Sequence, residues 1–124
     1  MNFKDLKKLN IEHIKYLENK ILNKEFDLVD KIIESLDDHI FNSQVIKLLY
    51  ANSKVLNKKS NLLDKKKAFE IFLEIYKANP NLIKILYNAS ILCFELQEYN
   101  EILILLEQFL DKNKYDQKIY DALY

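Results

Sequence analysis

The sequence predicts an all-α protein, and three observations support this fold class. Apolar residues recur at steps of three and four, as in Leu82, Ile85, Leu86, Ala89 and Leu92, which is the stripe of an amphipathic helix. No stretch shows the apolar and polar alternation of a half-buried strand. The chain of 124 residues contains no glycine and one proline, so glycine-dependent turns and phosphate-binding loops have no residue to build them. We therefore expect helices joined by short polar turns.

Polar breaks between the apolar stripes divide the chain into about seven expected helices. They cover roughly residues 3–22, 25–37, 43–57, 64–78, 82–96, 99–112 and 116–124. Ser43, Asp64, Asn81 and Asp116 precede apolar runs, where a short side-chain oxygen can accept a hydrogen bond from an unpaired helix amide. Pro80 disfavours a helical conformation at the preceding residue, so we expect a helix to stop there.

An internal repeat is the most informative feature of the sequence. Val45–Ser53 reads VIKLLYANS and Leu82–Ser90 reads LIKILYNAS, without a gap and 37 residues apart. A weaker third copy begins at Lys118, 34 residues after Lys84. Two-helix repeats of this period are typical of helical solenoids, in which each pair buries its apolar face against the next. We expect a right-handed α-solenoid of about three antiparallel helix pairs plus a terminal helix, forming one domain over residues 1–124.

One repeat resembles the tetratricopeptide repeat family. Ala68, Phe72 and Pro80 reproduce that family's A-x3-F…P pattern in the second helix of a pair and the turn after it. Where the family has a small glycine in the first helix, this chain has Ser53 and Ser90. The resemblance implies stacked helix pairs whose first helices line a concave groove. It also implies a protein–protein interaction module that binds a peptide or partner protein in this groove.

Residues that repeat on the first helices, away from the apolar stripe, are the candidate peptide contacts. Lys47, Lys84 and Lys118 are equivalent in the alignment, and Tyr50 and Tyr87 follow about one helical turn later. Ammonium groups backed by phenols suit a peptide or protein partner that carries carboxylates. The alternative is that the lysines form a solvated face while the tyrosines pack between adjacent first helices.

No motif in the sequence indicates a catalytic, cofactor or metal site, so we expect neither enzyme activity nor a small-molecule substrate. His13 and His39 lack a second histidine at zinc-binding spacing and are expected to be ordinary surface or partly buried residues. Cys93 is the only cysteine, which excludes an intrachain disulfide and fits a reducing, cytoplasmic setting. Its apolar neighbours predict a buried, unreactive thiol.

Charge and hydropathy argue against nucleic-acid and membrane partners. The chain carries 19 basic and 19 acidic residues, and its most apolar run, residues 102–106, is too short to span a bilayer. One basic cluster is present, formed by Lys54, Lys58, Lys59, Lys65, Lys66 and Lys67. No aromatic residue is interleaved with it and the chain has no arginine, so the usual means of stacking on bases and reading them are missing.

The end of the sequence leaves three alternatives open. The last expected helix, residues 116–124, is half of a repeat and ends on Ala122, Leu123 and Tyr124. This helix can cap the stack, or it can pair with a second copy as a homodimer, which would make the chain a self-associating structural domain. Because segments of the resembled family often precede transferase domains, the chain can also be the N-terminal scaffold of a larger glycosyltransferase-like or sulfotransferase-like protein.

Overall fold

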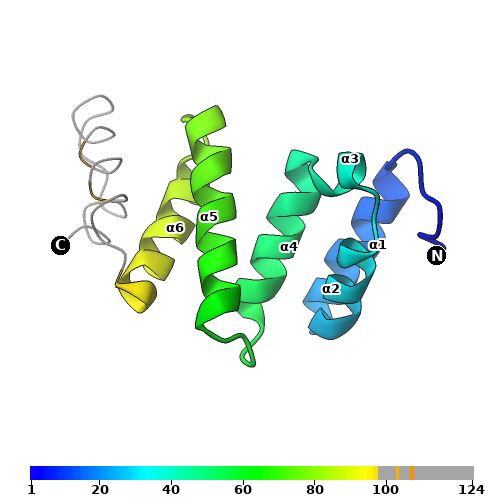
Figure 1. Ribbon diagram of the computed structural model, residues 1–124, viewed down its shortest axis with the longest axis horizontal. Helices are drawn as coiled ribbons and strands as arrows, with labels where there is room; N and C mark the ends of the chain where they lie inside the picture. The colour runs from blue at the N-terminus through cyan, green and yellow to red at the C-terminus, as the bar shows by residue number, and fades with distance from the viewer. Residues whose placement is uncertain (98–102, 104–106, 108–124) are drawn as a thin grey trace. The chain divides into compact units, whose positions relative to one another are not determined.

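All regular secondary structure in the described part of the chain is α-helical. The computed structural model describes residues 1–97, 103 and 107. Its helices are α1 (Ile11–Leu22), α2 (Phe26–Glu34), α3 (Asp38–Phe41), α4 (Gln44–Leu56), α5 (Leu62–Ala78) and α6 (Ile83–Leu96) (Figure 1). The all-α prediction is confirmed for these residues, and five of the six helices coincide with expected ones. The helices expected over 99–112 and 116–124 lie outside the described residues.

The chain divides into two compact units, residues 1–64 and residues 65–124, and each is described by itself. The boundary falls in the first turn of α5, so the first unit holds α1 to α4. In the described part, the second unit holds the remainder of α5 together with α6. One domain over residues 1–124 stays a prediction.

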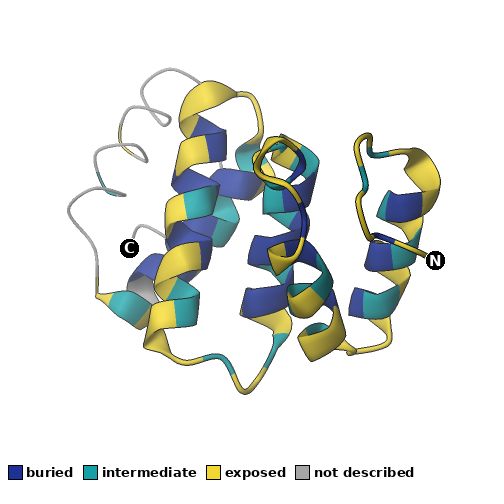
Figure 2. Cartoon of the chain, turned by 45° about the vertical axis from the view of Figure 1, so that its right-hand side comes forward, coloured by how far each residue is buried: buried dark blue, intermediate teal, exposed yellow. Residues whose placement is uncertain are grey.

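The first unit is built from three helices that all contact one another. α1 packs on α2, and α4 packs on both of them, while the short α3 packs on α4. The buried residues of these helices include Leu17, Val29, Ile33 and Ile46, each with no exposed surface. Each helix carries both buried and exposed positions (Figure 2). Because each helix contributes an apolar stripe at three- and four-residue spacing, three of them enclose a common core.

The expected helix over residues 3–22 begins only at Ile11, so the predicted start was wrong. The Asn10 side-chain oxygen accepts hydrogen bonds from the Glu12 and His13 amides, and His13 Nδ1 accepts one from the Asn10 amide at 3.1 Å. This reciprocal capping box fixes the helix start. Phe3 precedes this helix start and is nevertheless buried, with its ring centroid 5.2 Å from that of His13. An apolar residue ahead of Ile11 thus belongs to the core without being part of a helix.

The three predicted caps in the described residues also differ from the structure. At α6 the N-cap position is Leu82 and not Asn81, and no side chain caps this helix. Ser43 does precede α4, but its hydroxyl donates to the Ile40 carbonyl and does not accept from the helix. Asp64 lies inside α5, where its amide donates to Asn61 Oδ1 at 2.9 Å and its carboxylate accepts from the Asn61 amide at 3.2 Å. The cap therefore lies at Asn61, one turn earlier than predicted, because Asn and Asp exchange hydrogen bonds at this spacing.

The turn between α1 and α2 contains a residue in the left-handed backbone conformation that is not glycine. The Lys24 amide donates to the Ile21 carbonyl at 3.0 Å, and the Glu25 amide donates to the Lys20 carbonyl at 2.9 Å. These two bonds form the Schellman motif that ends many helices, and its left-handed position is usually glycine. Lys24 occupies it here with φ of 61°, so this turn holds a backbone conformation that is unfavourable for lysine.

The second unit buries the residues on which the family resemblance depends. Ala68 and Phe72 on α5 have no exposed surface, and Pro80 lies in the break between α5 and α6, as expected. Lys65 Nζ at the start of α5 lies 3.0 Å from Glu95 Oε2 near the end of α6, so the two helices run antiparallel. Cys93 is buried as predicted, with 1% of its surface exposed.

The two copies of the sequence repeat bury equivalent positions. Leu49 and Ser53 are buried on α4, and their equivalents Leu86 and Ser90 are buried on α6. Each serine has no exposed surface, as expected for a small residue at a helix contact. A small side chain lets the backbones of two packed helices come close together.

Candidate functional site

The predicted groove residues are distributed over both units. Lys47 and Tyr50 lie on α4 in the first unit, and Lys84 and Tyr87 lie on α6 in the second. Lys118 lies outside the described residues. The structure therefore describes the two pairs separately and leaves their union in one groove a prediction.

Tyr50 is a packed residue of the first unit. It is 5% exposed, its hydroxyl donates to Glu34 Oε1 at 2.8 Å, and its ring meets that of Phe41 edge-on at 5.7 Å. Tyr50 therefore packs within the first unit, against Glu34 of α2 and Phe41 of α3. On α6, Lys84 is exposed and Tyr87 is half-buried, so this pair has surface to offer a partner.

A cluster of charged and polar side chains surrounds Lys54, which belongs to the basic cluster of the sequence. The Lys54 ammonium lies 3.5 Å from Asp30 Oδ2 and 3.4 Å from Asp64 Oδ1, with only 6% of its side chain exposed. It also stands 4.5 Å from the centre of the Tyr50 ring, within range of a cation–π contact. Ser53 donates to Asp30 Oδ1 at 3.0 Å. This Lys54 cluster ties α2, α4 and the start of α5 together.

Burial sets the electrostatics of the Lys54 cluster. Desolvation raises the pKa of Asp30 above its ordinary value, and it outweighs the opposing effects of Lys54 and the Ser53 hydrogen bond. Desolvation alone would lower the pKa of Lys54, but its contact with Tyr50 and the charges of Asp30 and Asp64 raise it overall. Burial first, and then the hydrogen bond to Glu34, raises the pKa of Tyr50. These directions favour a charged lysine beside a neutral phenol.

The Lys54 cluster is suited to structure rather than to chemistry. Its lysine is shared between two carboxylates, and no buried side-chain nitrogen or oxygen in the described residues lacks a hydrogen-bond partner. Neither of the two cavities considered below is lined by Asp30, Tyr50 or Lys54. A catalytic group needs access to a substrate, and Tyr50 and Lys54 are both buried, with 5% of their surface exposed.

The histidines also have structural surroundings. His13 is buried and, through its Nδ1 atom, forms half of the α1 capping box, whereas His39 Nε2 lies 3.0 Å from the Lys7 carbonyl oxygen. Among residues 1–97, 103 and 107, no three His, Cys, Asp or Glu side chains gather closely enough to hold a metal ion. None of the helices described is long and apolar enough to cross a membrane.

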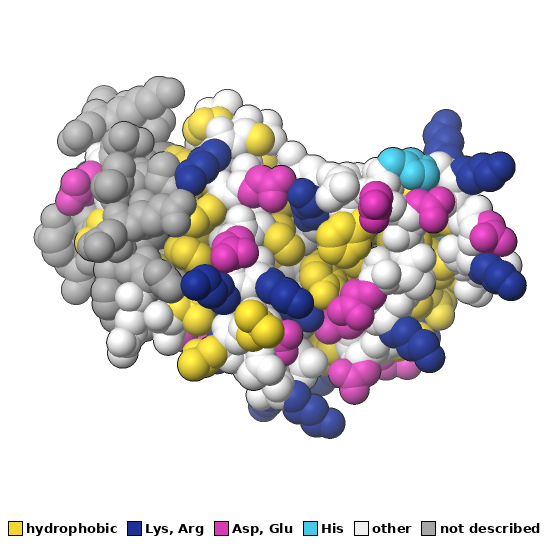
Figure 3. Space-filling view, viewed as in Figure 1, with side chains coloured by type: hydrophobic (Ala, Val, Ile, Leu, Met, Phe, Trp, Pro, Cys, Tyr) yellow, Lys and Arg dark blue, Asp and Glu magenta, His cyan; other side chains and the backbone are white. Residues whose placement is uncertain are grey.

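An open cavity of about 440 Å³ lies where α1 ends, α2 begins and α4 ends. Its apolar lining is Ile21, Leu22, Phe26 and Leu56, and its polar lining is Lys24, Asn57, Lys58 and Lys59. We call it the lysine-rimmed groove. Leu22 is 78% exposed and Leu56 is 57% exposed, so large apolar side chains border the opening. In the space-filling view, lysine and hydrophobic side chains lie close together around the connection from α4 to α5 (Figure 3).

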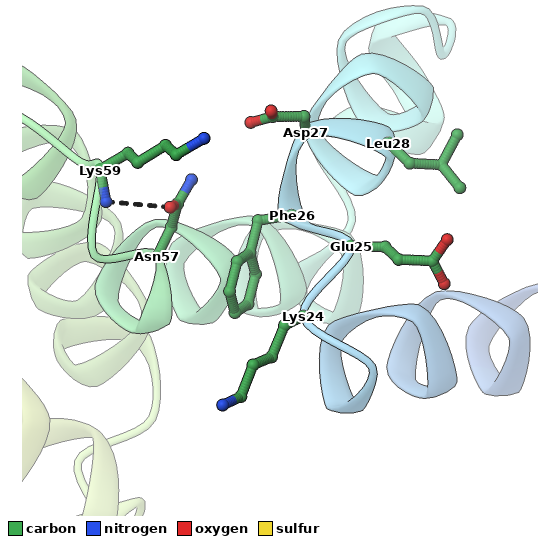
Figure 4. Close-up of a pocket in the computed structure, with 7 residues that line it drawn as sticks. All are labelled: Lys24, Glu25, Phe26, Asp27, Leu28, Asn57 and Lys59. Carbon is green, nitrogen blue, oxygen red and sulfur yellow. Dashed lines mark hydrogen bonds between the residues drawn. The ribbon is translucent and has the colours of Figure 1, made fainter.

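A smaller cavity of about 330 Å³ continues the groove and shares four lining residues with it. Its close-up shows the Phe26 ring with Asn57 on one side and Lys24 on the other (Figure 4). Glu25 points away from Asn57, and its carboxylate lies 3.3 Å from Lys20 Nζ. Asp27 and the Lys59 ammonium point toward one another. The acidic residues of this extension are thus directed away from Lys24.

Sequence reasoning missed the lysine-rimmed groove because its walls come from three separate helices. One signal was present: Leu22 and Leu56 are bulky apolar residues at the predicted ends of helices, each followed within three residues by lysine. Two of the basic-cluster lysines, Lys58 and Lys59, do line the groove. Lys54 does not, because its ammonium is paired inside the first unit.

Comparison with known proteins adds no family assignment. The chain matches no protein-family model, no curated protein and no solved structure. The chain is a small all-α protein, with six helices in its described part.

Proposed function

We propose that this chain is a protein-binding module built from stacked helix pairs of the tetratricopeptide kind, and that it recognises a peptide or a segment of a partner protein. The packing of α4 on both α1 and α2 supports the stack, because the first helix of a following pair makes these contacts in a helical solenoid. The equal burial of Ser53 and Ser90 at repeated positions supports it further.

The observation that carries the binding function is the lysine-rimmed groove. Exposed leucines gathered around an open cavity, with charged residues at its edge, are typical of surfaces that bind another polypeptide. A buried enzyme pocket would place convergent titratable groups around a reacting atom. The groove offers apolar area and ammonium groups, which favour association over catalysis.

Affinity capture from a lysate of the source cells, read by quantitative mass spectrometry, tests this function. The baits are the wild-type chain, a groove variant (Leu56→Gln with Lys58→Glu) and an α6 variant (Lys84→Ala with Tyr87→Ala). Ile11→Gln with Lys31→Glu is the matched control, since Ile11 is 65% exposed on α1, Lys31 is exposed on α2 and neither lines the groove. Circular dichroism first establishes that every bait is folded.

We expect the wild-type and control baits to enrich the same protein and at least one surface variant to lose it. Loss from the α6 variant alone would place binding on the predicted Lys84 and Tyr87 surface. Recovery of identical proteins on all four baits would contradict a binding role for both surfaces.

A further inference from the structure

We infer that the lysine-rimmed groove binds an acidic peptide that presents bulky apolar side chains, an inference that rests on the proposed binding function and names its ligand. The apolar lining accounts for one half of this chemistry. Phe26 is half-buried within the groove, while Leu22 and Leu56 stand exposed at its border. An apolar side chain from a ligand would remove all three from water, which is favourable by about 25 cal/mol for each Å² buried.

The charge of the groove accounts for the other half. Lys24, Lys58 and Lys59 are its only charged lining residues, and no ion pair recorded in the described structure engages their ammonium groups. Asp27 of the adjoining cavity points toward Lys59, but Lys24 and Lys58 have no acidic side chain beside them in the lining of the groove. These two cations favour a ligand with carboxylates. Because each ammonium keeps a long flexible stem, it can reach carboxylates at several positions beside the apolar contact.

Lysines that follow a helix C-terminus also offset the partial negative charge of that helix end, and Lys24 and Lys58 lie just after α1 and α4. That role explains the positions of the lysines, but it does not explain why Leu22 and Leu56 are exposed beside them. A ligand that covers the leucines and meets the lysines uses both features together.

The groove is held in shape before any ligand arrives. The Schellman bonds fix Lys24, and the Lys59 amide donates to Asn57 Oδ1 at 3.0 Å. The Ser60 hydroxyl donates to the Lys54 carbonyl at 2.6 Å, which secures the loop after α4. A preformed wall reduces the entropy lost when a peptide binds.

The openness of the groove favours a peptide over a small amphipathic acid such as a fatty acid. Sites for small ligands usually enclose most of the ligand surface. Here Leu22 and Leu56 border the cavity with more than half of their surface in water. A fatty acid would leave much of its tail exposed, whereas a peptide lying across the opening would shield both leucines.

Selection of a displayed library of random sixteen-residue peptides on the whole wild-type chain tests the inference without knowledge of the natural partner. We expect the selected sequences to combine Asp or Glu with Leu, Ile, Phe or Trp. Synthetic copies are then titrated by fluorescence anisotropy against the wild type, the groove variant and the Ile11→Gln, Lys31→Glu control.

The inferred site requires that the groove variant weaken binding at least about tenfold while the control keeps the wild-type affinity. It also requires that added salt weaken binding, since surface charges are screened. Selected peptides that bind the groove variant as tightly as the wild type would overturn the groove while leaving the proposed peptide-binding function standing.

Other results overturn the inference in different ways. Enrichment of basic peptides, or of apolar peptides insensitive to salt, would refute the acidic ligand. Oleate that binds the groove while no peptide is enriched would identify a lipid site instead. Failure of both the peptide selection and the lysate capture would overturn the proposed function together with this inference.

Discussion

The Lys54 ammonium lies 3.5 Å from the Asp30 carboxylate in the interior of the first unit, on the contact between α4 and α2. A second carboxylate, that of Asp64 in the first turn of α5, lies 3.4 Å from the same ammonium group. Because the charged nitrogen is buried, these partners are required to offset the cost of removing it from water. One lysine therefore holds three helical segments at a fixed spacing.

Replacing Lys54 by methionine should strongly destabilise the chain. The change leaves Asp30 partly buried beside Glu34 without its counterion, at a cost of about 3 kcal/mol in the free energy of unfolding. Urea denaturation measures this loss. The exposed pair Lys20 and Glu25 provides the control, because Lys20→Met should cost less than about 1 kcal/mol.

A double-mutant cycle isolates the Lys54 and Asp30 contact. Asp30→Asn combined with Lys54→Met should cost about 1 to 3 kcal/mol less than the sum of the two single changes, since both remove the same pair. Strict additivity would mean that the two charges stabilise the fold independently.

Alkaline pH should destabilise the chain through Tyr50 and Lys54. Folding raises the pKa of Tyr50 above 10.0 and that of Lys54 above 10.5. The unfolded chain therefore releases these protons at lower pH, so their stabilisation is present below about pH 10 and is lost as pH rises through the folded values. Between pH 8 and about pH 11, the free energy of unfolding measured by urea melts should fall less for Tyr50→Phe than for the wild type. Equal losses would contradict this role; Tyr87→Phe, which alters a half-buried tyrosine, is the control.

Glycine at position 24 should stabilise the chain. Lys24 has φ of 61° at the left-handed position of the α1 Schellman motif, where a side chain costs about 1 kcal/mol. Lys24→Gly should raise the free energy of unfolding by about 0.5 to 1 kcal/mol, and Lys24→Ala should not. If the two variants have equal stability, the left-handed backbone at this turn is not a source of strain.

Removing the Phe72 ring should leave a cavity in the second unit. The side chain has no exposed surface, so Phe72→Ala should cost about 3 to 5 kcal/mol. Ile91 is 41% exposed on α6, and Ile91→Ala should cost less than about 1 kcal/mol. Chemical denaturation of both variants checks the difference, and similar losses would contradict the core position of Phe72.

Enlarging Ser90 should overpack α6. Its side chain has no exposed surface, so a larger branched side chain would have to displace the residues packed around it. Ser90→Leu should therefore cost about 1 to 3 kcal/mol, whereas Ser90→Ala keeps the volume small and should cost far less. Thermal melts that do not separate the two variants would argue against a tight helix contact here.

The apolar spacing of the sequence determined most of the helices, and its local exceptions have physical causes. α4 and α6 fall within one residue of the repeat-bearing helices predicted at 43–57 and 82–96. The start of α1 was misplaced because the bond between His13 Nδ1 and the Asn10 amide competes with continuation of the helix. Periodicity does not report this local competition, and histidine is less usual than Glu or Gln at that capping position.

The all-α class, the break at Pro80 and the buried, repeated serines follow from local sequence, because three- and four-residue spacing and backbone restrictions act over short distances along the chain. The roles of Tyr50, Lys54 and the leucines beside the lysine-rimmed groove depend on how the helices pack together. A lysine in a basic run and a lysine paired within a core have the same local sequence. Their difference comes from the side chains that α1, α2 and α4 bring together from positions far apart in the chain.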